Sequence, residues 1–393
     1  MNKCQLVIAF FAAFCWANIL SAQTNVKPRA ATILSEQQWE QVDATIDRGL
    51  TWLATKQQPD GAFESIDLGQ PAVTAFCLMA FLSQGESPVD GRYKQQLTKA
   101  IDFIADQQKP NGLLAVVAPQ AIPIPRSPIT NLASARARMG VTAAYNHAIT
   151  GLALSEAYGQ CSPEQSKRLT PVLEKAIAAT LELQRWQKDR EHDEGGWRYL
   201  TEYPGSAQAD LSVTGWELMF LRSAKTAGFD VPEKSIDAAV RYIENCFLKR
   251  ADLQVYTYQV GGIEMRTRAT AGAGVLALAH SGKNGSKEAI ASGDWILKHG
   301  FADYQQVTAK HAPRIADRYH YGAFVCSQAM FQLGGKYWKQ FFPPLVNALL
   351  KNQQADGSWP PEEKDKQFGN CYSTALGVLA LSVPDQILPI FQR

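Results

Sequence analysis

The stretch "KNQQADGSWPPEE", residues 351–363, repeats a phrase that first stands at residues 55–67 as "TKQQPDGAFESID". Both copies read Gln-Gln-x-Asp-Gly-x-aromatic, and before the later copy Leu345, Leu349 and Leu350 recur at helical spacing. Glycine tolerates a positive φ and aspartate can hydrogen-bond its own backbone, so Asp-Gly favours a turn. We therefore expect each phrase to end an amphipathic helix, with the aromatic side chain holding the turn against the next helix.

A second, more apolar helix is predicted after each turn. Related segments, such as "YSTALGVLAL" and "YNHAITGLAL", start at Val73, Tyr145, Val213, Thr270, Tyr321 and Tyr372. The turns are centred on Gly61, Gly112, Gly196, Gly262, Gly300 and Gly357. Internal self-similarity of this kind indicates a repeat architecture. Because the second helices are apolar almost all round, they should be buried on most sides.

Two concentric rings of helices satisfy this pattern. We predict an all-α fold of one domain, a closed α/α toroid of six helix pairs. An open solenoid is the alternative, but it would need polar capping repeats at both ends, and the last helix is as apolar as the others.

The N-terminus is typical of a signal peptide. Lys3 precedes an apolar run that ends in the small pair Ser21-Ala22. We expect residues 1–22 to be cleaved after Ala22, residues 23–35 to form a linker and residues 36–393 to form the toroid. A retained membrane anchor is the alternative. Both predict export, to the periplasm or the extracellular space.

The composition of the chain limits the kinds of partner and cross-link that we expect. The 393 residues are 46% hydrophobic and 19% charged, with a formal net charge of +2. No Lys/Arg cluster interleaved with aromatic residues is present, so we expect no nucleic-acid partner. Cleavage would leave Cys77, Cys161, Cys246, Cys326 and Cys371, an odd and scattered set that does not describe a disulfide framework. We place Cys77 and Cys326 about six residues deeper along their helices than Cys371, too far for a bridge, and expect five free thiols.

The turns carry a family resemblance. "QQPDGAF", "RWQKDREHDEGGW" and "QQADGSW" resemble turns of the squalene and oxidosqualene cyclases and of protein prenyltransferase β subunits. The resemblance covers residues 31–393. "YGAFVCSQAMFQLGGKYWKQ" and the closing "LPIFQR" are most similar to exported bacterial squalene-cyclase-like repeat proteins. This family resemblance implies an α/α toroid with a central cavity suited to isoprenoids.

The catalytic motifs of those families are incomplete here. The cyclase motif Asp-x-Asp-Asp is absent, and at the matching place, "SAQADLSVTGW", Asp210 stands alone. It could be a helix N-cap or a general acid with a raised pKa. His320 matches the zinc-binding histidine of the prenyltransferases, but "RTRATAGAG" offers no companion ligand, and Cys371 lies on the wrong helix. We expect neither a metal nor another cofactor.

A third kind of chemistry on such a toroid is polysaccharide cleavage, which needs paired carboxylates or a base along a cleft. The run "DREHDEGGW", residues 189–197, supplies four acids around Glu191. A solvated charged turn is the alternative reading of that run.

The starts of the inner helices should share one mouth. This brings together Tyr145, His147, Asp210, Trp216, Arg266, Arg268, Tyr319, His320, Tyr321, Cys371 and Tyr372. Arginine at the start of a buried helix needs an anion or a carboxylate, and Asp210 is a candidate partner. Core packing is the alternative role for the aromatic residues and for His147.

Two functions remain open. The first is an exported toroid that binds an apolar or isoprenoid-like ligand without turning it over. The second is an active enzyme, either an atypical isoprenoid cyclase with Asp210 as the candidate catalytic residue or a polysaccharide lyase or hydrolase that uses the acids near Glu191. Peripheral association with a membrane stays open, and the sequence names no protein partner.

Overall fold

The computed structural model describes residues 33–118, 131–200, 208–262, 266–304 and 318–392. The predicted signal peptide, residues 1–22, and most of the predicted linker lie outside the described residues. Across the described part of the chain, no helix combines the length and the apolar character that crossing a membrane requires.

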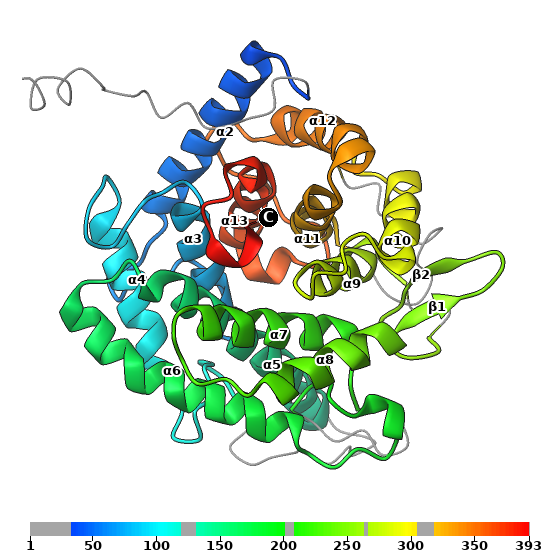
Figure 1. Ribbon diagram of the computed structural model, residues 1–393. Coiled ribbons are helices and arrows are strands. Elements are labelled where there is room, and N and C mark those ends of the chain that lie inside the picture. The colour runs from blue at the N-terminus through cyan, green and yellow to red at the C-terminus, as the bar shows by residue number, and fades with distance from the viewer. Residues whose placement is uncertain (1–32, 119–130, 201–207, 263–265, 305–317, 393) are drawn as a thin grey trace, which may run out of the picture.

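The helices form two concentric rings (Figure 1), which confirms the predicted all-α toroid of six helix pairs. The inner ring holds α3 (Ala72–Leu82), α5 (Asn131–Tyr158), α7 (Leu211–Thr226), α9 (Arg268–Ala279), α11 (Tyr319–Leu333) and α13 (Gly369–Leu381). The outer ring holds α2 (Glu36–Thr55), α4 (Lys94–Asp106), α6 (Pro163–Gln184), α8 (Glu233–Asn245), α10 (Lys287–Lys298) and α12 (Gly335–Asn352).

Short elements connect the long helices, and two more follow the last helix, α13. They are the strands β1 (Phe247–Lys249) and β2 (Gln254–Tyr256), which pair antiparallel, and the 3-10 helices η1 (Asp67–Gly69), η2 (Glu191–Asp193), η3 (Lys366–Phe368), η4 (Val383–Asp385) and η5 (Pro389–Phe391).

The two rings differ in the way that their sequences predict. Every residue of α3 is buried, because neighbouring inner helices, its outer partner and the centre of the ring surround it. In α8 the buried positions include Ile236, Ala239, Val240 and Ile243, which repeat at the spacing of one helix face. The remaining surface of that helix meets solvent. A helix that is apolar on all sides therefore belongs to the inner ring, and a helix with one apolar face belongs to the outer ring.

The repeated glutamine phrase acts as a joint between neighbouring helix pairs. Gln57 Nε2 donates to the carbonyl of Gly61 in its own turn (3.0 Å) and to the carbonyl of Gln96 in α4 (2.8 Å). Gly61 has φ 98°, and a Cβ there would lie 2.2 Å from the carbonyl oxygen of Lys99. The turn therefore requires glycine both for its backbone angle and for its close approach to the next outer helix. The aromatic residue that follows, Phe63, is buried, as predicted.

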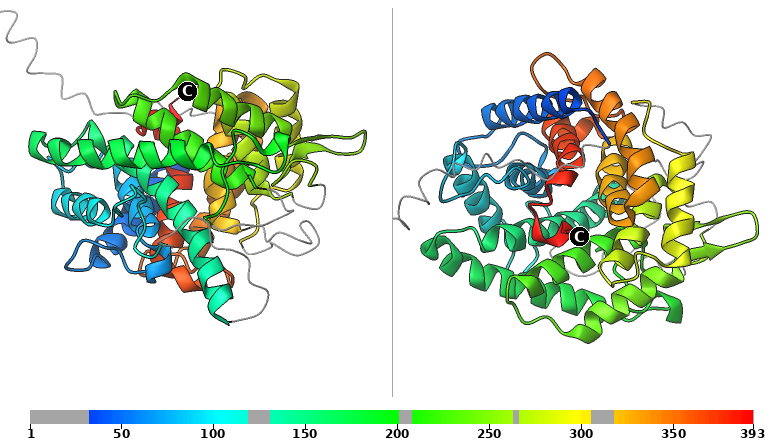
Figure 2. Two further views of the ribbon diagram at one scale, coloured as in Figure 1. Left: turned by 90° about the horizontal axis from the view of Figure 1, so that it is seen from below. Right: turned by 45° about the horizontal axis from the view of Figure 1, so that its top comes forward.

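The same joint recurs around the ring. Gln108, Gln184 and Gln353 each donate to the glycine carbonyl of their own turn and to a carbonyl of the next outer helix. For Gln353 the second acceptor is Thr45 of α2, at 2.9 Å, so the last repeat binds the first one. Helix α13 packs against both α2 and α3, and α12 packs against α2, so the ring is closed, as the tilted view in Figure 2 shows.

Some predicted turn positions were wrong. The positive φ occurs at Gly195 and Gly261, one residue before the predicted turn centres Gly196 and Gly262, and Gly300 has no positive φ. The joint of the fourth pair is the β1–β2 hairpin, which we did not predict, and the ring of Tyr256 packs directly on Gly274 of α9. Strands of three residues are too short to produce an alternating pattern, so the sequence does not reveal them.

Candidate functional site

A cavity of about 650 Å³ lies inside the inner ring, at the end where most inner helices begin. All six inner helices contribute to its wall, together with residues of the connections that precede α3, α7, α9, α11 and α13. Helix starts converge there because every pair repeats the same outer-then-inner order. The cavity is therefore a consequence of the repeat, whereas its chemistry depends on the individual side chains.

Aromatic and aliphatic side chains form most of the wall and the floor. The apolar lining includes Leu68, Val73, Phe76, Ile149, Trp216 and Phe368. Phe76 meets Trp216 edge-on, with 5.6 Å between ring centroids, and meets Tyr372 at 5.9 Å. The indole Nε1 of Trp216 donates to the hydroxyl of Tyr321 at 3.0 Å, which fixes the orientation of both rings. Such a floor favours an apolar ligand.

One side of the cavity is polar. Tyr145, Arg198, Tyr199 and Tyr258 line it, and the hydroxyls of Tyr199 and Tyr258 are hydrogen-bonded to each other. The guanidinium of Arg198 lies over the ring of Tyr199, 5.0 Å from its centroid. Burial raises the pKa of the Tyr145 hydroxyl well above its ordinary value, and the neighbouring Tyr199 and Asp210 add to the effect. The Tyr145 hydroxyl therefore stays protonated and can both donate and accept.

Asp210 lies behind this polar side. Its side chain is fully buried and caps α7, since Oδ1 accepts from the backbone N–H of Val213 at 2.9 Å. Its other oxygen, Oδ2, is also buried and has no hydrogen-bond partner within the described part of the chain. Burial raises the pKa of Asp210 to about 6, against the opposing effect of the Arg198 charge and the Tyr258 hydroxyl. The contacts therefore show Asp210 as the N-cap of α7.

Of the residues predicted to share the mouth, Tyr145, Trp216, Tyr321 and Tyr372 line the cavity. Asp210 lies next to the lining residue Tyr258, although it does not itself line the cavity.

Arg268 and Tyr319 point away from the cavity, contrary to our expectation. The guanidinium of Arg268 donates to the carbonyl of Gly300 at 2.8 Å and lies 3.7 Å from the centroid of the Phe301 ring. The hydroxyl of Tyr319 donates to the carbonyl of Phe301 at 2.9 Å. Side chains on a helix rotate by about 100° per residue, so adjacent positions at one helix start cannot all face the axis. Arg198, and not Arg268, provides the positive charge near Asp210.

His320 also lies outside the cavity. Its Nδ1 is 3.0 Å from Oε2 of Glu362, whose other oxygen accepts from the His320 backbone N–H at 3.0 Å. The paired histidine lowers the pKa of Glu362 to about 2, although burial acts in the opposite direction. The described residues contain no group of three or more His, Cys, Asp or Glu side chains that could hold a metal. The pair joins the start of α11 to the connection between α12 and η3.

His147 belongs to a buried hydrogen-bond chain between α5, α6 and α7. Its Nδ1 accepts from the backbone N–H of Leu114 (3.2 Å), Nε2 lies 2.9 Å from Thr180 Oγ1, and that hydroxyl donates to Glu217 (2.9 Å). Burial lowers the pKa of His147 to about 4, so the ring is neutral. In the first repeat Thr74 accepts the equivalent N–H, from Phe63. His147 therefore performs the structural role of the repeat threonine.

The two other predicted mouth residues also miss the cavity wall. Arg266 is half-buried before the α9 N-cap, and Cys371 is buried at the start of α13. All five described cysteines are free, as expected, but Cys77 Sγ lies only 3.8 Å from the carbonyl oxygen of Cys371. That contact makes their axial offset smaller than the six residues that we predicted.

The acids of residues 189–194 do not reach the cavity. Asp193 is buried, and its Oδ2 accepts from the backbone N–H of Gln208 at 2.8 Å. Glu191 is exposed. In the described part of the wall no carboxylate pair is present, so the geometry that glycoside hydrolysis needs is not seen there.

Sequence reasoning missed Arg198, Tyr199, Tyr258 and Arg318. Each lies in a connection, outside the self-similar helices that drew attention. Arg318 forms an ion pair with the fully buried Asp365, which positions it at the rim of the cavity. A usable signal existed for one pair, because Arg198 and Tyr199 directly follow the turn aromatic Trp197.

Known structures share the fold. No protein-family model and no curated protein matches the sequence. The type II terpene cyclase MstE from Scytonema aligns with 89% of this chain and 99% of its own, at 15% identity and a TM-score of 0.53. The GH76 α-mannanase BT2949 of Bacteroides thetaiotaomicron aligns with 90% of this chain and 96% of its own, at 12% identity and 0.55. The GH76A α-1,6-mannanase from Salegentibacter sp. HEL1_6 aligns with 89% of this chain and 99% of its own, at 13% identity and a TM-score of 0.55.

A variant of MstE has been solved in complex with its substrate, geranylgeranyl dihydroxybenzoate. At these identities the comparisons establish the α/α toroid and leave the chemistry to the residues of the site.

Proposed function

We propose that this protein binds an apolar, isoprenoid-like molecule in its central cavity. The supporting observation is the aromatic floor of Phe76, Trp216 and Tyr372 below a polar side of hydroxyls and a guanidinium. At about 30 Å³ for each non-hydrogen atom, a volume of about 650 Å³ accommodates on the order of 20 atoms. That capacity corresponds to a chain of three or four isoprene units. The isoprenoid substrate of a cyclase with the same fold is consistent with it.

Displacement of an apolar fluorescent probe by farnesol and geranylgeraniol tests the proposal. Ala269 lines the cavity at the start of α9, so Ala269→Leu should fill part of it and weaken prenol binding at least tenfold. Ala279→Leu makes the same change at the other end of the helix and should leave binding unchanged. Equal affinities in both variants, or no displacement by any prenol, would contradict the proposal.

Cyclisation of such a ligand is the second candidate function. Its specific support is Asp210, which lies behind the cavity wall beside the lining residue Tyr258 and whose pKa burial raises to about 6. Protonation of an alkene needs an acid of this kind. Asp210→Asn should keep the N-cap and ligand binding but abolish any cyclic product. If the unaltered protein forms no cyclic product from farnesol, geranylgeraniol or squalene, binding without turnover is the function. A mannan control should yield nothing, since the described cavity wall has no carboxylate pair.

We also propose that residues 1–22 direct export and are removed. Their composition supports this, with Lys3, a following apolar run and Ser21-Ala22. Mass spectrometry of the protein recovered from the periplasm or the medium should give a chain that starts at Gln23, and an intact N-terminus would favour the anchor.

A further inference from the structure

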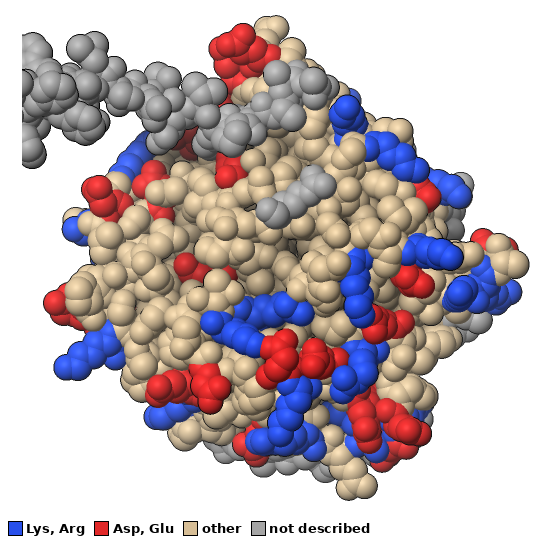
Figure 3. Space-filling model, in the orientation of Figure 1, with Lys and Arg blue, Asp and Glu red and all other residues tan. Residues whose placement is uncertain are grey.

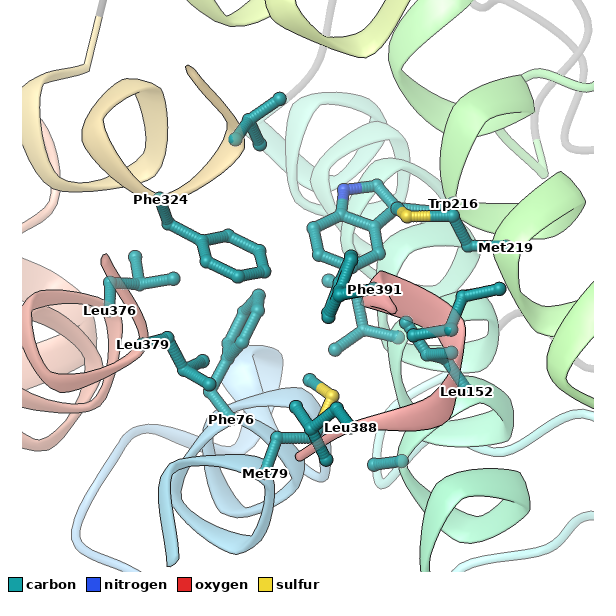
Figure 4. Packing of buried hydrophobic residues seen from close by; sticks show 14 of the residues in the cluster. Phe76, Met79, Leu152, Trp216, Met219, Phe324, Leu376, Leu379, Leu388 and Phe391 are labelled. Carbon is teal, nitrogen blue, oxygen red and sulfur yellow. The ribbon is translucent and has the colours of Figure 1, made fainter. Parts of the chain in front are cut away.

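The last described residues of the chain fill the inner ring from the end opposite the cavity mouth. After α13 the chain passes through η4 and enters η5, and the end of the chain lies over the centre of the ring (Figure 1). Leu388, Ile390 and Phe391 are only 3%, 8% and 3% exposed. Figure 4 shows Leu388 and Phe391 among side chains of α3, α5, α7, α11 and α13. A short tail therefore occupies space that all these helices surround.

The tail supports the floor of the cavity through one intermediate ring. Phe391 meets Phe324 of α11 edge-on, with 5.8 Å between centroids. Phe324 in turn stacks on Trp216 at 6.1 Å, and Trp216 lines the cavity. Removal of the Phe391 ring would leave Phe324 without support on the side away from the cavity. Because the interior is close-packed, the floor could then move into the released volume.

Polar anchors hold the tail in this position. Gln332 of α11 donates to the carbonyls of Phe391 (3.1 Å) and Gln392 (3.4 Å). The buried carboxylate of Glu156 accepts from the Ile390 backbone N–H at 3.2 Å, and its other oxygen accepts from the hydroxyl of Ser223. Burial raises the pKa of Glu156 to about 7, and a buried carboxyl group that receives a tail N–H is a specific attachment, because burying this polar group would be unfavourable without such donors. The surface around the end of the chain is mostly uncharged on the face that Figure 3 shows.

We infer that residues 388–391 set the length of the apolar chain that the cavity admits. The tail and the inner-helix side chains close one half of the ring, so an elongated ligand can extend only as far as the floor that Phe391 supports. This inference rests on the proposed isoprenoid binding. The Phe391 ring and its methylene occupy the volume of about seven non-hydrogen atoms at about 30 Å³ each, which is roughly one isoprene unit.

The experiment measures affinity for farnesol, geranylgeraniol and geranylfarnesol, which contain three, four and five isoprene units. We expect the affinity of the unaltered protein to fall at least tenfold beyond a limiting length. Phe391→Ala should move that limit one unit longer. Phe391→Leu keeps more of the side chain and should move it less, and it provides the measurement if the alanine variant does not fold.

Phe342→Ala is the matched control. This phenylalanine is also fully buried, but it lies in the outer helix α12 against Trp39 and Trp338. Its removal should lower stability without changing the length limit. An unchanged limit in the folded Phe391 variants would refute the role of the tail alone. A failure of the unaltered protein to bind any prenol would refute the proposed function on which the inference rests.

Discussion

Gly357→Ala tests the joint that closes the ring. Gly357 has φ 97°, and an added Cβ would lie 2.5 Å from the carbonyl oxygen of Arg48 and 2.9 Å from its carbon. The positive φ alone costs alanine about 1–3 kcal/mol. The contact adds strain of about 1–3 kcal/mol, because the Arg48 carbonyl belongs to the backbone of α2 and cannot rotate away as a side chain would. We therefore expect the free energy of unfolding to fall by about 2–6 kcal/mol.

Gly228→Ala separates the two contributions. Gly228 has φ 95°, but an added Cβ there would meet no atom of the described residues within 4 Å, its chain neighbours apart. It should show the backbone cost without the contact. Urea denaturation followed by circular dichroism gives the free energy of unfolding for both variants. If Gly357→Ala is no more destabilising than Gly228→Ala, the last turn is not pressed against the first helix, and the closed ring is refuted.

Three further predictions follow from buried groups. Burial raises the pKa of Glu217 from an ordinary value near 4.5 to about 8. The protonated form is therefore favoured in the folded state, and the stabilisation that results is complete below about pH 4.5 and is lost as the pH rises from 4.5 to 8. Glu217→Gln should therefore gain stability relative to the unaltered protein by about 1.4 kcal/mol per pH unit in that window, measured by urea denaturation, and a constant difference would contradict the shift. Trp359→Ala removes a fully buried ring that packs on Gly377. It should lower the free energy of unfolding by about 3–5 kcal/mol without changing the affinity for prenols. A loss of less than about 1 kcal/mol would refute the structural role of the ring. Thiol titration of the denatured protein after cleavage should count five free cysteines, because the described chain contains no disulfide, and a count of three would indicate one.

The repeat was readable from local patterns. A glutamine, an Asp-Gly pair and an aromatic residue lie within a few positions of one another, and their partners are largely their own turn and the adjacent helices. Apolar residues all round a segment identify an inner helix, since only the interior of the ring accepts such a surface. The fourth connection escaped detection because its strands contain three residues each.

The site was only partly predictable. Tyr321 faces the cavity whereas its neighbours Tyr319 and His320 do not, and the rotation of α11 decides between them. Identical residue types thus received different roles within one helical turn. Arg198 and Tyr258 reach the wall from connections whose paths depend on distant packing.

The sequence by itself determined the helix pairs and the turns at Gly61, Gly112 and Gly357, and it favoured closure into a toroid, because each of these depends on residues close together in the chain or on a repeated joint. Only the tertiary structure decided which side chains line the cavity, that Arg198 and not Arg268 lies near Asp210, and that Phe391 supports the floor from the far end. These relations join residues far apart in the chain, and they depend on the rotation of each helix and on the path of the tail, which packing of the whole ring sets.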